Sequence, residues 1–273
     1  MSSRSHRPIT GTQNERVKQW RRWLKKPEEP SCPWLPVEGE KQIQELSRQR
    51  KLELLLVSDS RSRGNAPPDA AETVVLVDRL FSSLSNLDTP QGMIGFFRKP
   101  TWTWEQLPPR ILYLDRLQDP GNLGLILRAA AAADFGVVAA PGTVSPFNPK
   151  VVRSSSAYLW RVPLLSAVLP TELERRGYQL WVADAGADTV LYEVEFREPF
   201  AVVVGREGGP DNALIPAGLP RFRIPMASGV DSLNAAIAAS VVMYDVVRRR
   251  EAHGKRAEDR GETTAGFHRH TFG

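Results

Sequence analysis

From Arg110 onward, short apolar segments alternate with segments of helical character. Each apolar segment is hydrophobic along its whole length, which predicts strands buried on both faces. The predicted strands are Ile111–Asp115, Gly136–Ala140, Trp181–Ala185, Ala201–Gly205 and Phe222–Pro225. The predicted helices are Leu123–Asp134, Pro149–Leu159, Leu169–Arg176 and Ser232–Arg250. This alternation predicts an α/β domain with a mainly parallel sheet covered by helices on both faces.

The residues before Arg110 predict a second, smaller α/β unit. Its predicted helices are Gln13–Lys26, Glu38–Arg50 and Arg79–Leu87, and its predicted strands are Leu52–Ser58, Thr73–Asp78 and Gly92–Phe97. Prolines predict a loop over Pro27–Pro36 and a linker over Lys99–Pro109, whose Trp102 and Trp104 are expected to dock on a domain surface.

Positive charge is concentrated near the N-terminus. The chain has a formal net charge of +5, yet residues 1–64 alone hold 14 Lys and Arg against 8 Asp and Glu, a net of +6. Trp20 and Trp23 lie among these basic residues. Cations beside aromatic rings suit RNA, since phosphates attract the cations and unpaired bases stack on the rings. The pattern equally fits an amphipathic helix whose Trp residues face a core, so both interpretations stay open.

Several classes of protein fit the sequence poorly. Its single cysteine, Cys32, excludes an internal disulfide framework and suits a reducing compartment. No apolar run reaches the length of a membrane span, and no secretory signal is evident, so a cytoplasmic protein is expected. The histidines His253, His268 and His270 lack a convincing set of metal partners, so no metal is expected.

Three loops that follow predicted strands combine glycine with polar residues. They are D-P-G-N-L-G-L-I-L-R (Asp119–Arg128), V-V-V-G-R-E-G-G (Val202–Gly209) and the loop within Ile224–Ser240. Free backbone N–H groups at helix starts, with Ser and Asn beside them, form polar binding corners. Ser232 is predicted to cap the last helix, with Asn234 in its first turn. The three loops together predict a small-molecule site at one edge of the sheet.

In this order and at these separations, the loops resemble the three motifs of the SpoU/TrmH branch of the SPOUT RNA methyltransferases. The matching strings are Asn122-x-Gly124-x-x-x-Arg128, Gly205-x-Glu207, Ile224-Pro225-Met226 and Ser232-Leu233-Asn234. The resemblance runs from Ile111 to about Arg250. Shorter phrases extend it to the N-terminal unit, V-E-G-E-K (Val37–Lys41) and T-P-Q-G-M (Thr89–Met93).

The resemblance implies a C-terminal SPOUT α/β domain with a parallel sheet and a deep trefoil knot, preceded by a smaller α/β RNA-binding domain. The expected organisation is an RNA substrate-binding domain at 1–105, with 1–12 disordered, a methyltransferase domain at 106–251 and a disordered tail at 252–273. It also implies S-adenosylmethionine as cofactor and a homodimer. The wide apolar surface of the predicted Ser232–Arg250 helix independently suits a dimer interface.

Transferred residue by residue, the resemblance implies an active site and a cofactor pocket. The implied active-site residues are Asn122, Arg128, Glu207, Ser232 and Asn234, and the implied cofactor contacts are Gly205, Ile224, Met226 and Leu233. The implied reaction moves a methyl group to a ribose 2′-hydroxyl of RNA. Because Arg is almost never deprotonated in proteins, Arg128 is expected to clamp a phosphate and stabilise the developing alkoxide.

Alternatives remain at the level of function. Ribosomal RNA is the favoured substrate and transfer RNA the second. A non-catalytic RNA-binding protein of the same fold is a further alternative, although the chain has all the implied catalytic residues. A nucleotide-dependent oxidoreductase is disfavoured because no G-x-G-x-x-G fingerprint follows an early strand.

Overall fold

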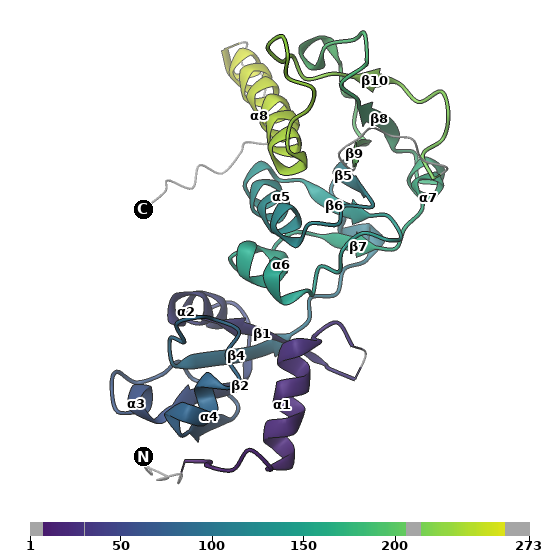
Figure 1. Ribbon diagram of the computed structural model, residues 1–273. Coiled ribbons are helices and arrows are strands. Elements are labelled where there is room, and N and C mark those ends of the chain that lie inside the picture. Colours follow the sequence, from purple (N-terminus) through teal and green to yellow (C-terminus); the bar gives the residue numbers. More distant parts are fainter. Residues whose placement is uncertain (1–7, 30, 206–213, 260–273) are drawn as a thin grey trace.

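The structure, a computed structural model, describes residues 8–29, 31–205 and 214–259, with side chains described as far as 252. The chain forms two sheets, one above the other in Figure 1, joined by the linker Lys99–Pro109. Helices α2 (Glu40–Ser47) and α6 (Pro149–Ser154) lie between the two sheets. No helix in the described ranges is both long and apolar enough to cross a membrane.

The N-terminal sheet has the strand order β1-β4-β2-β3. Its strands are β1 (Trp34–Glu38), β2 (Leu52–Ser58), β3 (Thr73–Leu76) and β4 (Met93–Arg98). Only the β2–β3 pair is parallel. Alternate residues of β2 face opposite sides, as strand geometry requires. Leu54 and Leu56 join one core cluster, while Leu55 and Val57 join another.

Helices cover both faces of this sheet. α1 (Glu15–Lys25) and α4 (Asp78–Ser82) share a core cluster with Leu54 and Leu56, and α2 packs on the opposite face. Trp20 and Trp23 are only 2% and 8% exposed within that first cluster. Of the two interpretations that the sequence left open for this pair, the core interpretation is therefore confirmed.

Strand β1 begins inside the loop that was predicted over Pro27–Pro36. It is an edge strand that pairs only with β4, and edge positions tolerate proline because one side of the strand needs no ladder hydrogen bonds. Ordered structure also reaches into the segment 1–12, which the composition predicts to be disordered. The Ile9 N–H donates to the Val75 carbonyl at 2.9 Å, which attaches this segment beside β3.

The C-terminal sheet is entirely parallel, in the order β10-β8-β9-β5-β6-β7. Its strands are β5 (Arg110–Asp115), β6 (Gly136–Ala139), β7 (Leu164–Ser166), β8 (Gln179–Ala183), β9 (Phe200–Gly205) and β10 (Arg221–Phe222). The predicted α/β architecture with a parallel sheet is confirmed. The three-residue β7 escaped prediction because so short an apolar run has no usable periodicity.

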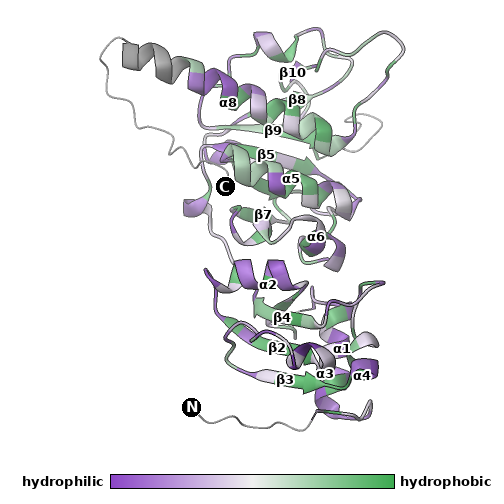
Figure 2. Cartoon of the chain, turned by 90° about the vertical axis from the view of Figure 1, so that its left-hand side faces the viewer, coloured by the Kyte–Doolittle hydropathy of each residue, from purple (hydrophilic) through white to green (hydrophobic). Residues whose placement is uncertain are grey.

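Helices also cover both faces of the C-terminal sheet. α5 (Pro120–Ala133), α6 and α8 (Ala235–Asp259) share a core cluster with Leu112 and Val202, whereas α7 (Pro170–Arg175) packs on the other face. Hydrophobic residues make up much of α5 and the beginning of α8, which pack together (Figure 2). α8 continues to Asp259, so part of the predicted disordered tail is helical.

Aromatic side chains join the two parts of the chain. Trp160, 2% exposed, lies edge-on to Phe97 with ring centroids 6.1 Å apart, and its indole N–H donates to the Arg98 carbonyl at 2.8 Å. Trp104 of the linker lies under the Arg176 guanidinium at 4.1 Å. Trp102 packs against the main core cluster. The predicted docking of both linker tryptophans is confirmed.

Candidate active site

The candidate site lies at the carboxyl edge of the parallel sheet, where β5 and β9 end side by side. Asp115, the last residue of β5, pairs in register with Gly205, the last of β9. An added Cβ at Gly205 would lie 3.9 Å from the Asp115 carboxylate, in ordinary contact. Asp115 is 2% exposed. No motif indicated this carboxylate, although a charged residue that closes the apolar run Ile111–Leu114 was a usable signal.

The first motif begins α5 at this edge. The Asp119 carboxylate accepts the Asn122 N–H at 2.7 Å, and Pro120 occupies the first turn, where its missing N–H costs nothing. This cap places Asn122 in the opening turn of the helix. Gly124 follows at a point where α5 approaches α6 so closely that an added Cβ would lie 1.8 Å from the Ser154 hydroxyl oxygen. The glycine is therefore required by packing.

The third motif meets the first. The Asn234 amide N–H donates to the Asn122 side-chain oxygen at 3.0 Å, across 112 positions of sequence. The Asn234 side-chain oxygen accepts the N–H of Ala236 at 2.9 Å and of Ile237 at 3.4 Å. Because the oxygen is committed to capping α8, the amide nitrogen must face Asn122. The helix starts of α5 and α8 are thereby held together.

This geometry corrects the predicted start of the last helix. The helix begins at Ala235, not at Ser232, and Asn234 is its cap instead of a member of its first turn. Ser232 is exposed in the loop before the cap. An amide oxygen at Asn234 and a hydroxyl at Ser232 are both good caps, so spacing alone did not decide between them.

The structure does not bring Arg128 to Asn122. The two residues are six positions apart on α5, about 240° around the helix, so they leave it on different sides. Arg128 is exposed, and within the described ranges no hydrogen bond or ion pair engages it. One turn before it, Leu125 is 50% exposed. Arg128 is therefore available to a ligand or to another chain.

The implied cofactor residues occupy the expected edge of the sheet. Strand β10 ends at Phe222, earlier than predicted, so Ile224 and Met226 lie in the loop between β10 and α8. Both are half-buried, as are Leu233 and Gly205. Partly covered apolar side chains beside a strand end suit a small organic ligand. Glu207, the remaining implied catalytic residue, lies outside the described residues.

Tyr113 lies on β5, two residues before Asp115, and its phenol is unsuited to proton transfer. Burial strongly raises its pKa, and its hydroxyl donates to the Val168 carbonyl at 2.9 Å. It therefore stays neutral and structural. In the described part of the chain, no group of three or more His, Cys, Asp and Glu side chains is placed to hold a metal ion. The histidine side chains at 253, 268 and 270 lie outside that part.

The two N-terminal phrases of the resemblance also meet in space. Gly39 (φ +108°) directs its N–H toward the Met93 carbonyl at 3.5 Å. Glu40 forms an ion pair with Arg61 at 2.6 Å, and this guanidinium lowers the pKa of Glu40. Gly92 (φ +81°) has no room for a side chain, because an added Cβ would lie 2.7 Å from Arg61.

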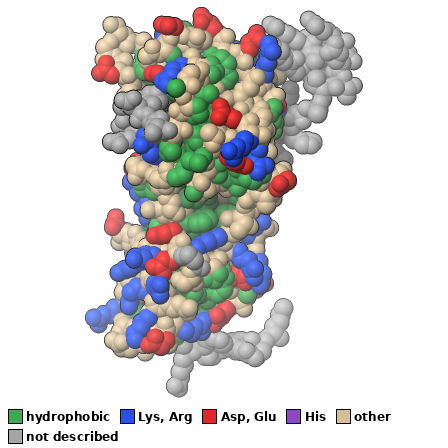
Figure 3. All heavy atoms as spheres, turned by 90° about the vertical axis from the view of Figure 1, so that its right-hand side faces the viewer, with side chains coloured by type: hydrophobic (Ala, Val, Ile, Leu, Met, Phe, Trp, Pro, Cys, Tyr) green, Lys and Arg blue, Asp and Glu red, His purple; other side chains and the backbone are tan. Residues whose placement is uncertain are grey.

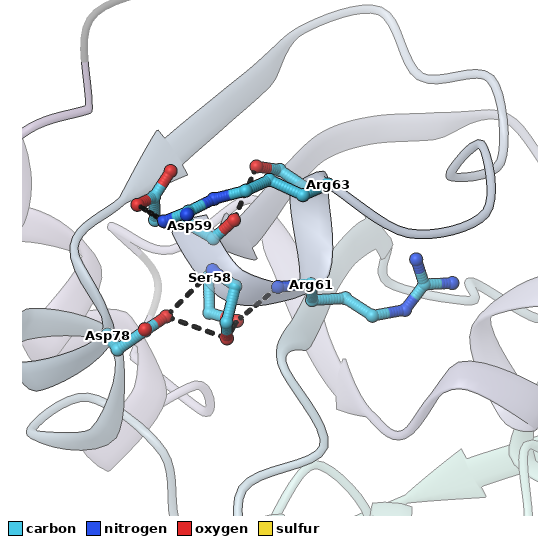
Figure 4. Close-up of polar contacts among 7 residues, drawn as sticks. Ser58, Asp59, Arg61, Arg63 and Asp78 are labelled. Atoms are coloured by element: carbon cyan, nitrogen blue, oxygen red, sulfur yellow. Dashed lines mark hydrogen bonds and ion pairs between the residues drawn. The ribbon is translucent and has the colours of Figure 1, made fainter.

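The short helix α3 (Asp59–Ser62), which follows β2, is held by several polar contacts (Figure 4). Asp78 accepts the Ser60 backbone N–H at 3.0 Å and its hydroxyl at 2.9 Å, and these bonds lower the pKa of Asp78. Ser58 accepts the Arg61 N–H at 3.3 Å, and Arg63 pairs with Asp59. Of the two arginines here, Arg61 is mostly buried against Glu40, and Arg63 remains largely exposed.

Comparisons with known proteins find relatives that match most of the chain. The family model described as the SpoU rRNA Methylase family matches residues 109–244. A 23S rRNA guanosine-2′-O-methyltransferase of Bacillus subtilis is 30% identical over 244 residues, which cover 86% of this chain and 97% of the relative. A 23S rRNA guanosine-2′-O-methyltransferase of Ralstonia nicotianae is 33% identical, over 72% of this chain and 77% of its own length.

Solved structures match over most of the chain. A crystal structure of an RNA 2′-O ribose methyltransferase superposes with a TM-score of 0.73 at 30% identity, covering 90% of this chain and all of the other. The SpoU methyltransferase AviRb from Streptomyces viridochromogenes, in complex with the cofactor AdoMet, gives a TM-score of 0.74 at 25% identity, covering 88% of this chain and 99% of its own.

Proposed function

Because the chain belongs to the SpoU rRNA methylase family, we propose that it transfers a methyl group from S-adenosylmethionine to a ribose 2′-hydroxyl of RNA. The observation that carries this proposal is the 3.0 Å hydrogen bond between Asn234 and Asn122. It joins the first and third motifs, and the second motif begins at Gly205, where β9 ends beside the end of β5.

We assign the cofactor to the carboxyl edge of the sheet. Ile224, Met226 and Leu233 offer half-buried apolar surface to the adenosine, and Gly205 leaves the backbone open to contact. These residue types fit S-adenosylmethionine, which combines an aromatic base with polar groups. When bound, the cofactor supplies a methyl group on a sulfonium leaving group.

The tasks left to the protein are alignment of the ribose and loss of the hydroxyl proton. We assign Asn122, Asn234 and Ser232 to orienting the ribose, together with Glu207. Arg128 clamps the neighbouring phosphate and stabilises the charge that develops on the 2′-oxygen. Its guanidinium does not act as base, since Arg stays protonated in proteins.

We further propose a homodimer whose interface includes α5 and α8. Leu125 on α5 and Ile237 and Tyr244 on α8 are 50%, 54% and 51% exposed. Ile237 and Tyr244 are seven positions apart, about two helical turns, which places both on one side of the helix. Apolar side chains that are exposed to solvent in one copy of the chain suit burial against a second copy. Arg128, one turn from Leu125, would then reach the active site of the partner subunit.

We infer the remaining organisation from the same family. Residues 1–105 form the RNA-recognition domain, which presents Lys and Arg side chains on the lower half of Figure 3, and residues 106–251 form the catalytic domain with its trefoil knot. Ribosomal RNA is the favoured substrate, because relatives named for 23S rRNA match over most of the chain, and transfer RNA is the alternative. The place of action is the cytoplasm.

A methyl-transfer assay tests this function. Purified protein with S-adenosylmethionine carrying a labelled methyl group is offered unmodified ribosomal RNA, transfer RNA or neither. Label should appear in 2′-O-methylated nucleosides after digestion of the ribosomal RNA. Methylation of transfer RNA alone would replace the substrate assignment. Cofactor binding without label in either RNA would support the non-catalytic RNA-binding alternative.

A further inference from the structure

A cavity of about 520 Å³ lies at the junction of the two parts of the chain, away from the site described above. Its lining includes the four cationic residues Arg50, Lys51, Arg98 and Lys99, and the rings of Trp102 and Trp160. The N-terminal sheet supplies Arg98, the linker supplies Trp102, and the catalytic part supplies Trp160. The volume is within the range of small-ligand sites.

Positive charge dominates this cavity. Glu53 is its one acidic lining residue, and its side chain is 8% exposed. Glu53 bonds both Lys51 and Arg98 at 2.9 Å, and these two cations lower its pKa. The side chains of Lys51 and Arg98 are nevertheless 68% and 81% exposed. One carboxylate cannot neutralise four cations, so the lining of the cavity has a net positive charge that would attract an anion.

Aromatic surface completes the cavity. Trp160 is fully buried and fixed by its bond to the Arg98 carbonyl. Trp102 is half-buried, and its indole N–H is closed off from solvent without a hydrogen-bond partner in the described part of the chain. A buried N–H left unbonded is costly, so a small shift of the linker that brings an acceptor to it would be favourable.

We propose that this interdomain cavity binds a single-stranded segment of the substrate RNA, with a phosphate among the cations and a base against Trp102. The inference rests on the proposed RNA methyltransferase function. The linker enters β5 at Arg110, whereas the active site lies beyond Asp115, so the six-residue strand of about 20 Å separates the two sites. The cavity therefore holds RNA away from the target nucleotide and fixes the recognition domain relative to the catalytic domain.

A matched pair of charge variants tests the cation contacts. Arg98→Gln removes one of two cations on Glu53, and the control Arg175→Gln removes one of two cations on Glu172. Arg98→Gln should weaken RNA binding by about threefold or more and lower the salt-dependence slope by about 0.7, the loss of one phosphate contact on a single strand. The control should change neither value. Equal effects of the two variants would overturn the proposal.

A crosslinking probe tests the position of the RNA directly. Cys32, the single cysteine, is 1% exposed, so a cysteine introduced at a surface threonine can be labelled selectively with a photoreactive thiol reagent. Labelled Thr101→Cys, on the cavity rim, should crosslink to RNA, and labelled Thr171→Cys, an exposed position on α7, should not. If inorganic phosphate protects the cysteine at position 101 from the thiol reagent and RNA does not, the proposal is contradicted.

The same preparations separate this proposal from the proposed function. Methyl transfer and cofactor affinity are measured on the unsubstituted protein. If that protein binds S-adenosylmethionine but methylates no RNA, the proposed function fails. If it methylates RNA while the Thr101→Cys probe gives no crosslink above the Thr171→Cys control, the cavity proposal alone fails.

Discussion

Asn234 is expected to stabilise the catalytic domain in two separable ways. Its side-chain oxygen caps α8, and loss of such a cap costs about 1 kcal/mol. Its amide N–H bonds Asn122, and loss of one such hydrogen bond costs about 1 kcal/mol. Asn234→Ala removes both, so it should lower the free energy of unfolding by about 2 kcal/mol. For a domain of this size, that is a fall in Tm of about 4–8 °C.

Two further variants separate these contributions. A serine at this position still caps the helix but is too short to reach Asn122, so Asn234→Ser should cost about 1 kcal/mol. Asn122→Ala removes the same hydrogen bond from the other side and should cost a similar amount. The double variant Asn122→Ala/Asn234→Ser should be no less stable than either single variant, because the shared bond is lost only once.

Thermal and urea unfolding, followed at one protein concentration, measure these differences. Cofactor is left out, because a ligand that binds the native state would raise stability by mass action. Two results would refute the reasoning. Equal destabilisation by Asn234→Ser and Asn234→Ala would show that the cap contributes nothing. Additive losses in the double variant would show that the two asparagines do not interact.

Three other predictions concern catalysis, packing and pH. Arg128→Ala should abolish methyl transfer while leaving cofactor affinity intact by calorimetry, and Arg128→Lys should also be poor, because lysine lacks the planar two-pronged contact. Gly124→Ala should lower the free energy of unfolding by about 1–3 kcal/mol, because its Cβ would meet the backbone of Ser154 at 2.9 Å. Gly11→Ala, whose Cβ would have nothing within 4 Å, should cost less in the same urea titration. Glu40→Gln should be less stable than the unsubstituted protein above pH 4.5, the ordinary pKa of this carboxyl. Because the arginine partner of Glu40 lowers its pKa in the folded state, the difference in stability should shrink as pH falls below 4.5. A difference in stability that stays constant down to about pH 3 would contradict this prediction.

Much of the fold could be predicted because its strands carry strong local signals. Strand β2 was predicted with its observed bounds, since seven consecutive buried residues leave little ambiguity. Strand β1 was missed because Pro36, together with the prolines before the strand, indicates a loop until the place of β1 at the sheet edge is known. Strand pairing is decided by long-range contacts, which no local pattern contains.

The candidate site, like the fold, could be predicted only in part from the sequence. The motifs predicted that Asn122 and Asn234 belong to one site, and their hydrogen bond brings them together. The choice of Asn234 over Ser232 as the cap depended on where the loop meets α5, which is a tertiary constraint. The direction of Arg128, away from Asn122, follows from helix geometry that the sequence contained, but its consequence for a second subunit requires the folded surface.

The most direct test of the central claim is site-specific mapping of ribose methylation. Ribosomal RNA lacking the modification is incubated with S-adenosylmethionine and either the unsubstituted protein or Arg128→Ala, and 2′-O-methyl groups are mapped by their resistance to alkaline cleavage. We predict a ribose methylation that appears with the unsubstituted protein and is absent with Arg128→Ala. A protein that binds the cofactor yet leaves every ribose of ribosomal and transfer RNA unmethylated would contradict the claim.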